Sequence, residues 1–378
     1  MTDSRTDVLI VGGGVLGLAH AVAALRAGHS VTVCERTLVP RGASVRNFGM
    51  VWPIGQPAGP DLELARRSRR LWSEVSELAQ FPLRATGSLH LAYGEDELAV
   101  LHEFADGSPL PGLVVLTPDE VRNWQPAVVA EDLAGGLFSP HEANVDPPAA
   151  IAALQAWLPT QGVDLRRGTV VTHVESGVAT LANGSRLAAD HIVVCTGDDF
   201  ATLFPALFAA SDLQRCKLQM LALGAQPAGF ELGPMLAAGL TLLHYRGFAG
   251  CPTLGRLRAR LEANHAERLR RGIHVLVSQG DDGRLIVGDS HEYAEDFAPG
   301  LDDATERAIL DYLATFLRPP SLAITRRWSG SYALRRCGAS VFRAEPCPGV
   351  EIVTGVGGSG MTRSMALGEQ TVARWRNP

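Results

Sequence analysis

The sequence predicts an α/β protein of two parts: a parallel β-sheet with helices on its faces, and a second domain built on a mixed or antiparallel β-sheet. Three observations predict this class. An apolar segment at 8–11 runs directly into three glycines and an apolar helical pattern, a second glycine-rich turn follows the apolar segment at 350–354, and strand-like segments in the middle of the chain alternate apolar and polar residues. Continuously apolar strands are typical of parallel sheets buried on both faces, whereas alternation indicates an antiparallel sheet with one covered face.

Apolar periodicity predicts the other elements. Helices are expected where apolar residues recur at helical spacing, at 15–25, 61–81, 118–124, 146–158, 256–271, 302–317 and 365–375. Thr117 is placed to cap the third of these helices. Strands are expected at 31–34, 83–93, 170–174, 178–181, 192–195, 217–223, 241–245, 274–278 and 285–287, with Asn183 and Gly184 at a hairpin turn.

The composition limits the kinds of partner and the cellular location to be expected for this protein. With 378 residues and 46% hydrophobic composition the chain can bury two cores, and a formal net charge of −6 argues against a nucleic-acid partner. The first apolar run is too short to span a membrane and lacks a basic leader, so no membrane association is expected. The six cysteines form no CxxC pair. They therefore indicate neither a metal site nor a disulfide framework, and reduced thiols predict a cytoplasmic location.

Glycines at 12, 14 and 17 stand in the context that binds a dinucleotide. They follow a strand and open a helix, and Glu35 ends the next strand, 18 residues after Gly17. Such glycines let a pyrophosphate approach the backbone, and the helix N-terminus offers free N–H groups. Glu35 can accept hydrogen bonds from ribose hydroxyls and would repel a 2′-phosphate. The segment therefore predicts a Rossmann-type βαβ unit and disfavours NADP.

A second glycine-rich loop lies near the C-terminus. Residues 354–362 read TGVGGSGMT and link the strand at 350–354 to the last helix. Glycines there let the backbone approach a cofactor closely. A simple NAD-dependent dehydrogenase does not need this second loop, so FAD is the favoured cofactor, with an NAD enzyme as the alternative.

At these segments the chain resembles the D-amino-acid oxidase and sarcosine oxidase family of flavoenzymes. Residues 8–36 resemble its FAD-binding unit, 142–174 its central helix and a strand lying against the adenine, 189–197 its returning strand, and 328–330 with 354–369 its closing segment. The resemblance implies a glutathione-reductase-like FAD-binding domain. It also implies cofactor contacts from Gly12, Gly14, Val15, Leu16, Gly17, Glu35, Arg36, Ser44, Arg46, Asn47, Val171, Thr196, Gly197, Gly355, Gly357, Gly358, Gly360, Met361 and Thr362.

The same resemblance implies interleaved domains. The FAD-binding domain would comprise residues 1–80, 142–212 and 328–378, and the substrate-binding domain residues 81–141 and 213–327. The sequence indicates no oligomeric state.

Residues 46–57, RNFGMVWPIGQP, are similar to a subgroup of the family associated with phosphonate breakdown in bacteria. The similarity implies oxidation of the amine of a small aminophosphonate, 2-aminoethylphosphonate or its N-methyl derivative, by hydride transfer to the flavin and hydrolysis of the imine. Two alternatives stay open: the same chemistry on glycine, sarcosine or a D-amino acid, and a flavin-binding partner protein without turnover.

A small anionic amine needs cationic and polar groups around it. The candidate active-site residues are Arg46, Met50, His244, His291 and Arg335, with Arg246, Arg336 and Arg363 as further cations. Guanidinium groups suit phosphonate oxygens because they donate paired hydrogen bonds. In an extended segment only one of two adjacent arginines, such as Arg335 and Arg336, can point inward.

Three positions depart from the family pattern. Cys337 is displaced from the position at which some members attach FAD, so noncovalent FAD is expected. Leu285 or Ile286 stands where sarcosine oxidases place a lysine over the flavin, and Lys217 lies in another strand. The electron acceptor is therefore dioxygen or another molecule. Thr362 aligns with the family's carboxylate-binding basic residue, one position before Arg363.

Overall fold

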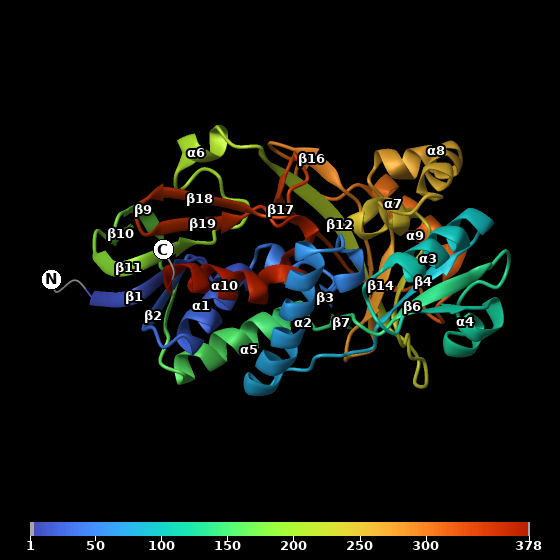
Figure 1. Ribbon diagram of the computed structural model, residues 1–378, viewed down its shortest axis with the longest axis horizontal. Coiled ribbons are helices and arrows are strands. Elements are labelled where there is room, and N and C mark those ends of the chain that lie inside the picture. Colours follow the sequence, from blue (N-terminus) through green and yellow to red (C-terminus); the bar gives the residue numbers. More distant parts are fainter. Residues whose placement is uncertain (1–3, 377–378) are drawn as a thin grey trace.

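The computed structural model describes residues 4–376. Two large sheets lie beside each other, and each is formed from segments far apart in the sequence (Figure 1). The first sheet has the order β18-β19-β11-β1-β2-β8. In addition, β10 pairs with β11, and β9 pairs with β10. Its strands are β1 (Ser4–Val11), β2 (Val31–Glu35), β8 (Asp164–Arg167), β9 (Val171–Glu175), β10 (Val178–Leu181), β11 (Arg186–Val194), β18 (Phe342–Cys347) and β19 (Val350–Thr354).

The central strands of the first sheet are parallel. β1 pairs in parallel with β11 and β2, β2 with β8, and β11 with β19. Parallel neighbours end at the same edge of a sheet, so the loops after β1, β2, β11 and β19 meet there. The first sheet packs with α1 (Val15–Arg26), α2 (Pro60–Leu78), α5 (Pro147–Thr160) and α10 (Gly360–Arg376), and α10 lies against both α1 and α2 (Figure 1).

The second sheet has the order β16-β12-β15-β14-β13-β4-β6-β5, and β17 pairs with β12. All its pairings are antiparallel except that of β13 with β4. Its strands are β4 (Ser88–Ala92), β5 (Val114–Leu116), β6 (Gly135–Ser139), β12 (Leu213–Ala225), β13 (Met235–Ala237), β14 (Leu276–Gln279), β15 (Arg284–Gly288), β16 (Glu292–Ala294) and β17 (Ile324–Arg335).

The helices that accompany the second sheet are α3 (Glu95–Gly107), α4 (Pro118–Trp124), α7 (Leu240–His244), α8 (Leu254–Arg270) and α9 (Asp303–Phe316). A short helix, α6 (Pro205–Ala209), precedes β12. A two-stranded ribbon of β3 (Met50–Val51) and β7 (Ala143–Asn144), with the short 3₁₀ turns η1 (Ala43–Val45), η2 (Pro53–Gly55), η3 (Arg246–Phe248) and η4 (Gly357–Ser359), completes the fold.

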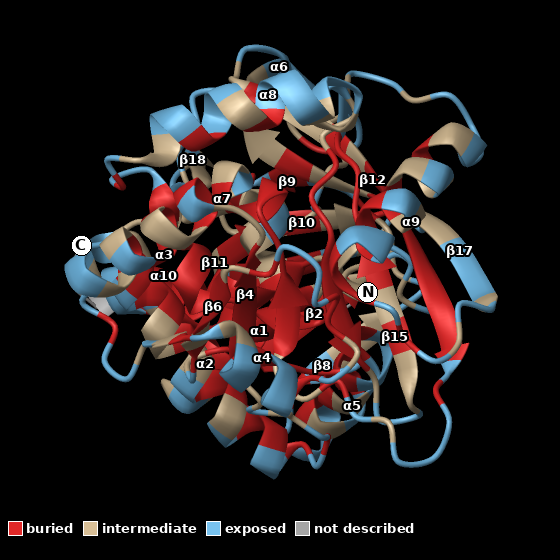
Figure 2. Cartoon of the chain, turned by 90° about the vertical axis from the view of Figure 1, so that its right-hand side faces the viewer, coloured by how far each residue is buried: buried red, intermediate tan, exposed pale blue. Residues whose placement is uncertain are grey.

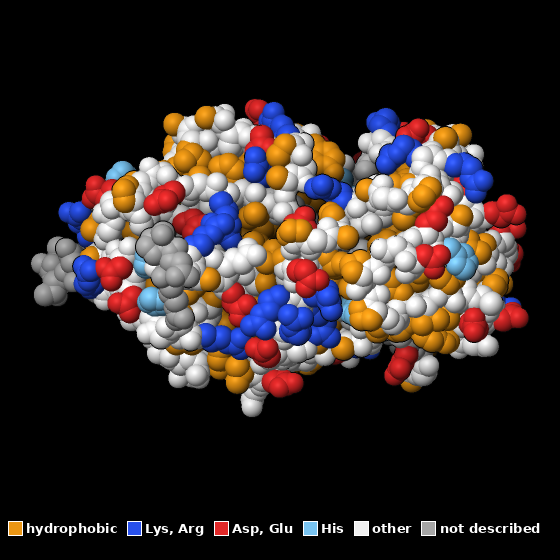
Figure 3. Space-filling model, in the orientation of Figure 1, with side chains coloured by type: hydrophobic (Ala, Val, Ile, Leu, Met, Phe, Trp, Pro, Cys, Tyr) orange, Lys and Arg blue, Asp and Glu red, His pale blue; other side chains and the backbone are white. Residues whose placement is uncertain are grey.

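Each sheet has its own hydrophobic core. One cluster lies between the second sheet and its helices, a second lies under α1, α2, α5 and α10, and a third covers the other face of the first sheet. Figure 2 shows buried strands at the centre and exposed helical surfaces outside. In Figure 3 Lys and Arg side chains gather over α2, whose Arg66, Arg67 and Arg70 lie on its half-buried or exposed positions. Within residues 4–376, no helix combines the length and the apolar character that a membrane crossing requires.

The predicted fold class is confirmed, but helix α3 was not expected from the sequence, and one short segment was assigned to the wrong type of element. Residues 241–245 were expected to form a strand but belong to α7, because a short apolar run is compatible with either structure. Thr117 caps α4 as predicted, and Gly184 has φ 82° at the expected hairpin turn. The domain boundaries stay a prediction. β17 spans the predicted boundary at residue 328 and pairs along β12 of the second sheet.

Candidate functional site

A cavity of about 450 Å³ lies at the carboxyl ends of β1, β2, β11 and β19 and reaches the second sheet. Its walls come from both glycine-rich loops, from the segment 40–57, and from β12, β14 and β17 with the loops beside them. It is therefore bounded by segments from the beginning, middle and end of the chain.

The first glycine-rich turn is too tightly packed for side chains. Gly12 has φ 111°, and a Cβ atom there would lie 2.3 Å from the carbonyl oxygen of Cys195. A Cβ atom on Gly17 would lie 1.8 Å from the carbonyl oxygen of Gly12. Gly12 lines the cavity, whereas Gly17 lies beneath the turn and lets α1 approach it. The turn therefore presents bare backbone to the cavity, as a pyrophosphate requires.

Glu35 lies directly beside this turn. Its carboxylate accepts hydrogen bonds from the backbone N of Gly13 at 2.7 Å and from the backbone N of Thr37 at 2.8 Å. The first N–H of α1, from Val15, donates to Ser44 Oγ at 2.9 Å. A carboxylate at the end of β2 and an oxygen-binding helix N-terminus are the groups that hold the ribose and the pyrophosphate of a dinucleotide.

Two further loops close the cofactor end. Thr354 Oγ1 donates to the carbonyl oxygen of Gly197 at 2.6 Å, which joins the loop after β11 to the second glycine-rich loop. Arg46 donates through a guanidinium nitrogen to the carbonyl oxygen of Ser329 at 3.0 Å. Asn47 turns back into its own loop, where its amide nitrogen donates to the carbonyl oxygen of Ala43 at 2.8 Å.

The residues present fit FAD. Apart from Gly17, each residue expected to contact the cofactor lines this one cavity: Gly12, Gly14, Val15, Leu16, Glu35, Arg36, Ser44, Arg46, Asn47, Val171, Thr196, Gly197, Gly355, Gly357, Gly358, Gly360, Met361 and Thr362. The side chain of Arg36 forms an ion pair with Asp199 at 2.7 Å. The hydroxyl of Thr362 accepts from the backbone N of Trp52 at 3.0 Å.

The other end of the cavity is rich in histidine. His244, His274 and His291 all line it, and the rings of His244 and His274 stack with centroids 3.7 Å apart. Asp289 and Tyr245 complete this end. Burial lowers the pKa of His244 and His274 well below the usual value and raises the pKa of Asp289 to about 6. His244 is enclosed by protein atoms but exposes its ring to the cavity.

Of the candidate active-site residues, Arg46, Met50, His244 and His291 line the cavity and Arg335 does not. Arg335 Nε donates to Asp212 Oδ1 at 2.8 Å, and Arg336 lies 4.0 Å from Glu295 on the exposed surface. Asp212 therefore holds Arg335 away from the cavity, and Arg336 lies on the surface outside the cavity lining.

The remaining arginines differ in their partners. Arg363 lines the cavity, but it is buried against the side-chain oxygen of Gln56 and lies 3.4 Å from Asp61, so its charge is compensated within the fold. Arg246 also lines the cavity and donates to the carbonyl oxygen of Gly338. No carboxylate among residues 4–376 forms an ion pair with Arg46 or Arg246. Their charges are therefore not compensated locally, and the donors that Ser329 and Gly338 do not use remain available to an anion.

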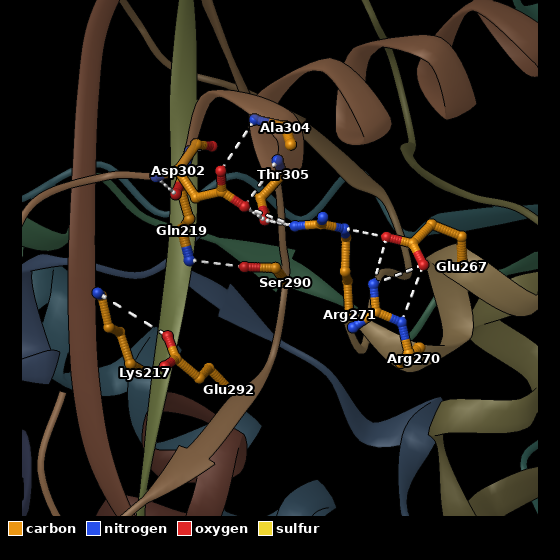
Figure 4. Close-up of polar contacts among 10 residues, drawn as sticks. All are labelled: Lys217, Gln219, Glu267, Arg270, Arg271, Ser290, Glu292, Asp302, Ala304 and Thr305. Atoms are coloured by element: carbon orange, nitrogen blue, oxygen red, sulfur yellow. Dashed lines mark hydrogen bonds and ion pairs between the residues drawn. The ribbon is translucent and has the colours of Figure 1, made fainter. Parts of the chain in front are cut away.

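Lys217 is turned away from the cavity. Its ammonium group donates to the carbonyl oxygen of Ala298 at 2.9 Å. It also lies 3.9 Å from Glu292, a contact drawn on the left side of Figure 4. Cys337 lies on an exposed loop outside the cavity lining.

Sequence reasoning missed His274, Asp289 and Tyr332, which also line the cavity. His274 and Asp289 lie 15 residues apart, and backbone pairing at the ends of β14 and β15 brings them together. The predicted strands at 274–278 and 285–287 could have indicated this if their register had been known.

The chain is similar to known oxidoreductases over most of its length. A family model described as FAD dependent oxidoreductase matches residues 7–374. Glycine oxidase of Geobacillus kaustophilus is 29% identical over 209 residues, which cover 51% of this chain and 55% of that protein. An opine oxidase component of Rhizobium meliloti is 22% identical over 365 residues, covering 91% of this chain and 87% of that protein. The chain thus spans about half the length of the first of these relatives.

Solved structures show the same fold. The crystal structure of the Geobacillus kaustophilus glycine oxidase superposes with a TM-score of 0.77 at 21% identity, covering 98% of this chain and 94% of that one. L-proline dehydrogenase from P. horikoshii superposes with a TM-score of 0.78 at 20% identity, covering all of this chain and 94% of that one. Because the family match extends over nearly the whole sequence and both glycine-rich loops line one cavity, the chain belongs to the family of FAD-dependent oxidoreductases.

Proposed function

We propose that the protein catalyses the FAD-dependent oxidation of the amine of a small aminophosphonate, 2-aminoethylphosphonate or its N-methyl derivative. One observation carries the proposal: a single cavity joins the dinucleotide-binding turn to a compact polar end with histidines and an arginine that has no carboxylate partner among residues 4–376. The resemblance of residues 46–57 to the phosphonate-associated subgroup supports the choice of substrate.

The protein side chains bind and orient the substrate. Bound FAD supplies the hydride acceptor, and hydrolysis of the resulting imine releases the carbonyl product. Arg246 and Arg46 would hold the phosphonate through charge-assisted hydrogen bonds. Met50 and Trp52, both buried on the cavity wall, would exclude water from the reacting amine.

The same chemistry on glycine, sarcosine or a D-amino acid is the second candidate. The similarity to glycine oxidase favours it, because that relative's name gives an amino acid as its substrate. An amino acid also carries an anionic group that Arg246 can bind. The two candidates differ in the size and charge of the anion.

Anaerobic mixing of the purified protein with single amines, while the absorbance of oxidised flavin is followed, tests both candidates. The panel contains 2-aminoethylphosphonate, its N-methyl derivative, glycine, sarcosine and several D-amino acids. Bleaching by an aminophosphonate alone supports the proposal, and bleaching only by amino acids replaces it with the second candidate. A flavin that none of these amines bleaches indicates a binding partner without turnover.

Arg246→Gln and Arg336→Gln form a matched pair for the anion contact. Arg336 is an exposed arginine like Arg246, but it is paired with Glu295 outside the cavity. We expect Arg246→Gln to weaken substrate binding about tenfold or more and Arg336→Gln to leave it unchanged. Equal binding by both variants would remove Arg246 from the proposal.

The electron acceptor and the form of FAD follow from the same preparation. Lys217 lies outside the cavity lining, so no lysine in the lining marks dioxygen as the acceptor. Readmitting air after bleaching shows whether dioxygen reoxidises the flavin or another acceptor is needed. We propose noncovalent FAD because Cys337 is exposed and outside that lining. Acid precipitation should therefore release the flavin into the supernatant.

A further inference from the structure

The histidine-rich end of the cavity has the form of a ligand set. His244, His274 and His291 each offer a ring nitrogen, and the three nitrogens lie within 4.8 Å of one another. The ring centroids of His274 and His291 are 5.0 Å apart, and those of His244 and His291 are 4.7 Å apart. Three imidazoles this close are more than one substrate anion needs.

Backbone pairing fixes two of the rings. The backbone N of His274 donates to the carbonyl oxygen of Asp289 at 3.3 Å, and the backbone N of Asp289 donates to that of His274 at 3.1 Å. This pair follows the end of the β14–β15 ladder with a register shift of one residue, because Leu276 pairs with Gly288 within the ladder. The backbone N of His291 donates to the carbonyl oxygen of Arg271 at 3.0 Å. Backbone hydrogen bonds therefore hold His274 and His291 just outside the strands β14, β15 and β16.

His291 is oriented for ligation. Its Nδ1 lies 2.9 Å from the carbonyl oxygen of Gly272, an arrangement in which Nδ1 carries the proton and Nε2 keeps its lone pair. Gly272 makes this contact possible, because it has φ 61° and a Cβ atom there would lie 2.6 Å from His291 Cβ. Metal-bound histidines characteristically donate their other ring N–H to a carbonyl or a carboxylate.

The polar atoms beside His291 are unsatisfied. Among the described residues, neither ring nitrogen of His274 nor Asp289 Oδ1 makes a hydrogen bond, although both side chains are buried. His274 Nε2 lies 3.3 Å from Asp289 Oδ1 without hydrogen-bond alignment. Buried polar groups without partners are costly, so each one calls for an explanation such as a ligand or an ion. A cation bound by one ring nitrogen of His274 would leave the proton on the other nitrogen, which could then donate to Asp289.

A network on the far side supports the cluster. Ser290 Oγ accepts from the backbone N of Gln219 at 3.2 Å, and the amide nitrogen of Gln219 donates to the carbonyl oxygen of Asp302 at 3.0 Å. Arg271 forms ion pairs with Glu267 at 2.7 Å and with Asp302 at 2.5 Å (Figure 4). These contacts hold Ser290, which precedes His291, and Arg271, whose carbonyl oxygen accepts from the backbone N of His291.

We propose that His244, His274 and His291 bind a divalent transition-metal ion of the zinc class, with Asp289 as the carboxylate that orients His274. Three imidazole ligands leave a fourth position open, as in metal sites that bind a substrate or water. That position faces the cavity, because all three histidines line it.

The ligands must close on the ion, and His244 must turn, because its ring is stacked on that of His274 at an interplanar angle of 27°. Donor atoms around tetrahedral zinc are about 3.4 Å apart, given Zn–N distances of about 2.1 Å, and here they lie within 4.8 Å. His244 exposes its ring to the cavity and is the ligand with room to turn. An anionic oxygen of the substrate would fill the open position, a step that rests on the function proposed above.

Titration with Co²⁺ tests the site directly. Tag-free flavoprotein is treated with a chelator and dialysed, and Co²⁺ is added while absorbance is followed at wavelengths longer than those of oxidised flavin. We expect one Co²⁺ per chain with the intense bands of tetrahedral coordination, and displacement by Zn²⁺. Absence of stoichiometric binding would overturn the proposal.

Variants locate the ion. His291→Gln and His244→Gln should each weaken Co²⁺ binding at least about tenfold, whereas His102→Gln, an exposed histidine on α3, should bind as the parent protein does. Retained flavin absorbance shows that each variant is folded, and the cavity-facing His244 gives the readout even where His291→Gln does not fold. Unchanged binding in both cluster variants would sink the assignment.

The two proposals fail separately. Co²⁺ binding without amine-dependent bleaching keeps the metal site and rejects the proposed oxidation. Bleaching by an aminophosphonate in protein that binds no Co²⁺ keeps the oxidation and rejects the metal site. A change in the Co²⁺ bands on adding 2-aminoethylphosphonate would support ligation of the substrate oxygen.

Discussion

At the scale of single residues, Gly12 lets the first glycine-rich turn pack directly against the backbone of Cys195, which follows β11. Its φ of 111° and the position of the Cys195 carbonyl oxygen, 2.3 Å from a built Cβ atom, leave no room for a side chain. We expect Gly12→Ala to cost about 1–3 kcal/mol in the free energy of unfolding and to displace the turn. The FAD content per chain and the melting temperature measure this. Gly42→Ala is the control, because Gly42 lines the same cavity with φ −78° and open space around it. Full FAD content in both variants would contradict the role of Gly12.

Glu142 predicts a pH dependence of stability. It is fully buried, its carboxylate accepts from Ile54 N and Ser88 Oγ, both at 2.9 Å, and burial raises its pKa to about 7. The folded chain binds this proton more tightly than the unfolded chain does. Protonation of Glu142 therefore adds to the free energy of unfolding below the ordinary pKa of 4.5, and this stabilisation is lost as pH rises through about 7. We expect the free energy of unfolding of the parent protein, measured with urea, to fall from about pH 5 to about pH 8. This fall should exceed that of Glu142→Gln by an amount on the order of 2–3 kcal/mol. Parallel pH profiles for the two proteins would disprove this.

Local motifs predicted residues at the cofactor end of the cavity better than residues at the substrate end. The turn at Gly12 and the acid at Glu35 follow from spacing within a single βαβ unit. His274 and Asp289 become neighbours only through the pairing of β14 with β15, and the exact register of two strands is not readable from either one. Arg335 was misplaced for a similar reason, because its partner Asp212 lies 123 residues away in sequence.

At the scale of elements, α2, α4, α8 and α9 were predicted to within a few residues. Short apolar segments were not, and neither was α3, whose N-cap residue Gly94 makes no side-chain hydrogen bond. α4 and α9 begin where Thr117 and Asp302 cap them. α7 has five residues, too few to show a period, and its helical state depends on packing in the core of the second sheet. The length of β17 was likewise not foreseen, because its stability comes from pairing with β12.

Two helix caps give a matched prediction at this scale. Asp146 caps α5 by accepting from Ala149 N at 2.9 Å, and Gln155 of the same helix donates to the carbonyl oxygen of Gly13 at 3.1 Å. Thr117 caps α4, which packs on β6 of the second sheet. Asp146→Ala and Thr117→Ala should each lower the free energy of unfolding by about 1 kcal/mol, because each removes a helix cap. Only Asp146→Ala should also weaken FAD binding. Chemical denaturation and flavin titration measure the two effects. Equal FAD affinities would show that α5 does not position the glycine-rich turn.

At the scale of the whole molecule, the cavity lies where three segments of the FAD-binding half meet the second sheet, so cofactor binding should stabilise both halves. Ligand that binds only the folded chain adds about 2.7 kcal/mol at a concentration one hundred times its Kd. We expect removal of FAD to lower the urea midpoint and resistance to proteolysis, and added FAD to restore them. The signal must come from both sheets, and the six tryptophans include Trp72 on α2, beside the first sheet, and Trp328 on β17 of the second sheet. ADP, which offers only the adenine, ribose and pyrophosphate contacts, should restore part of the stability. If the protein without FAD unfolds at the same midpoint as the flavoprotein, the cavity does not link the two sheets through the cofactor.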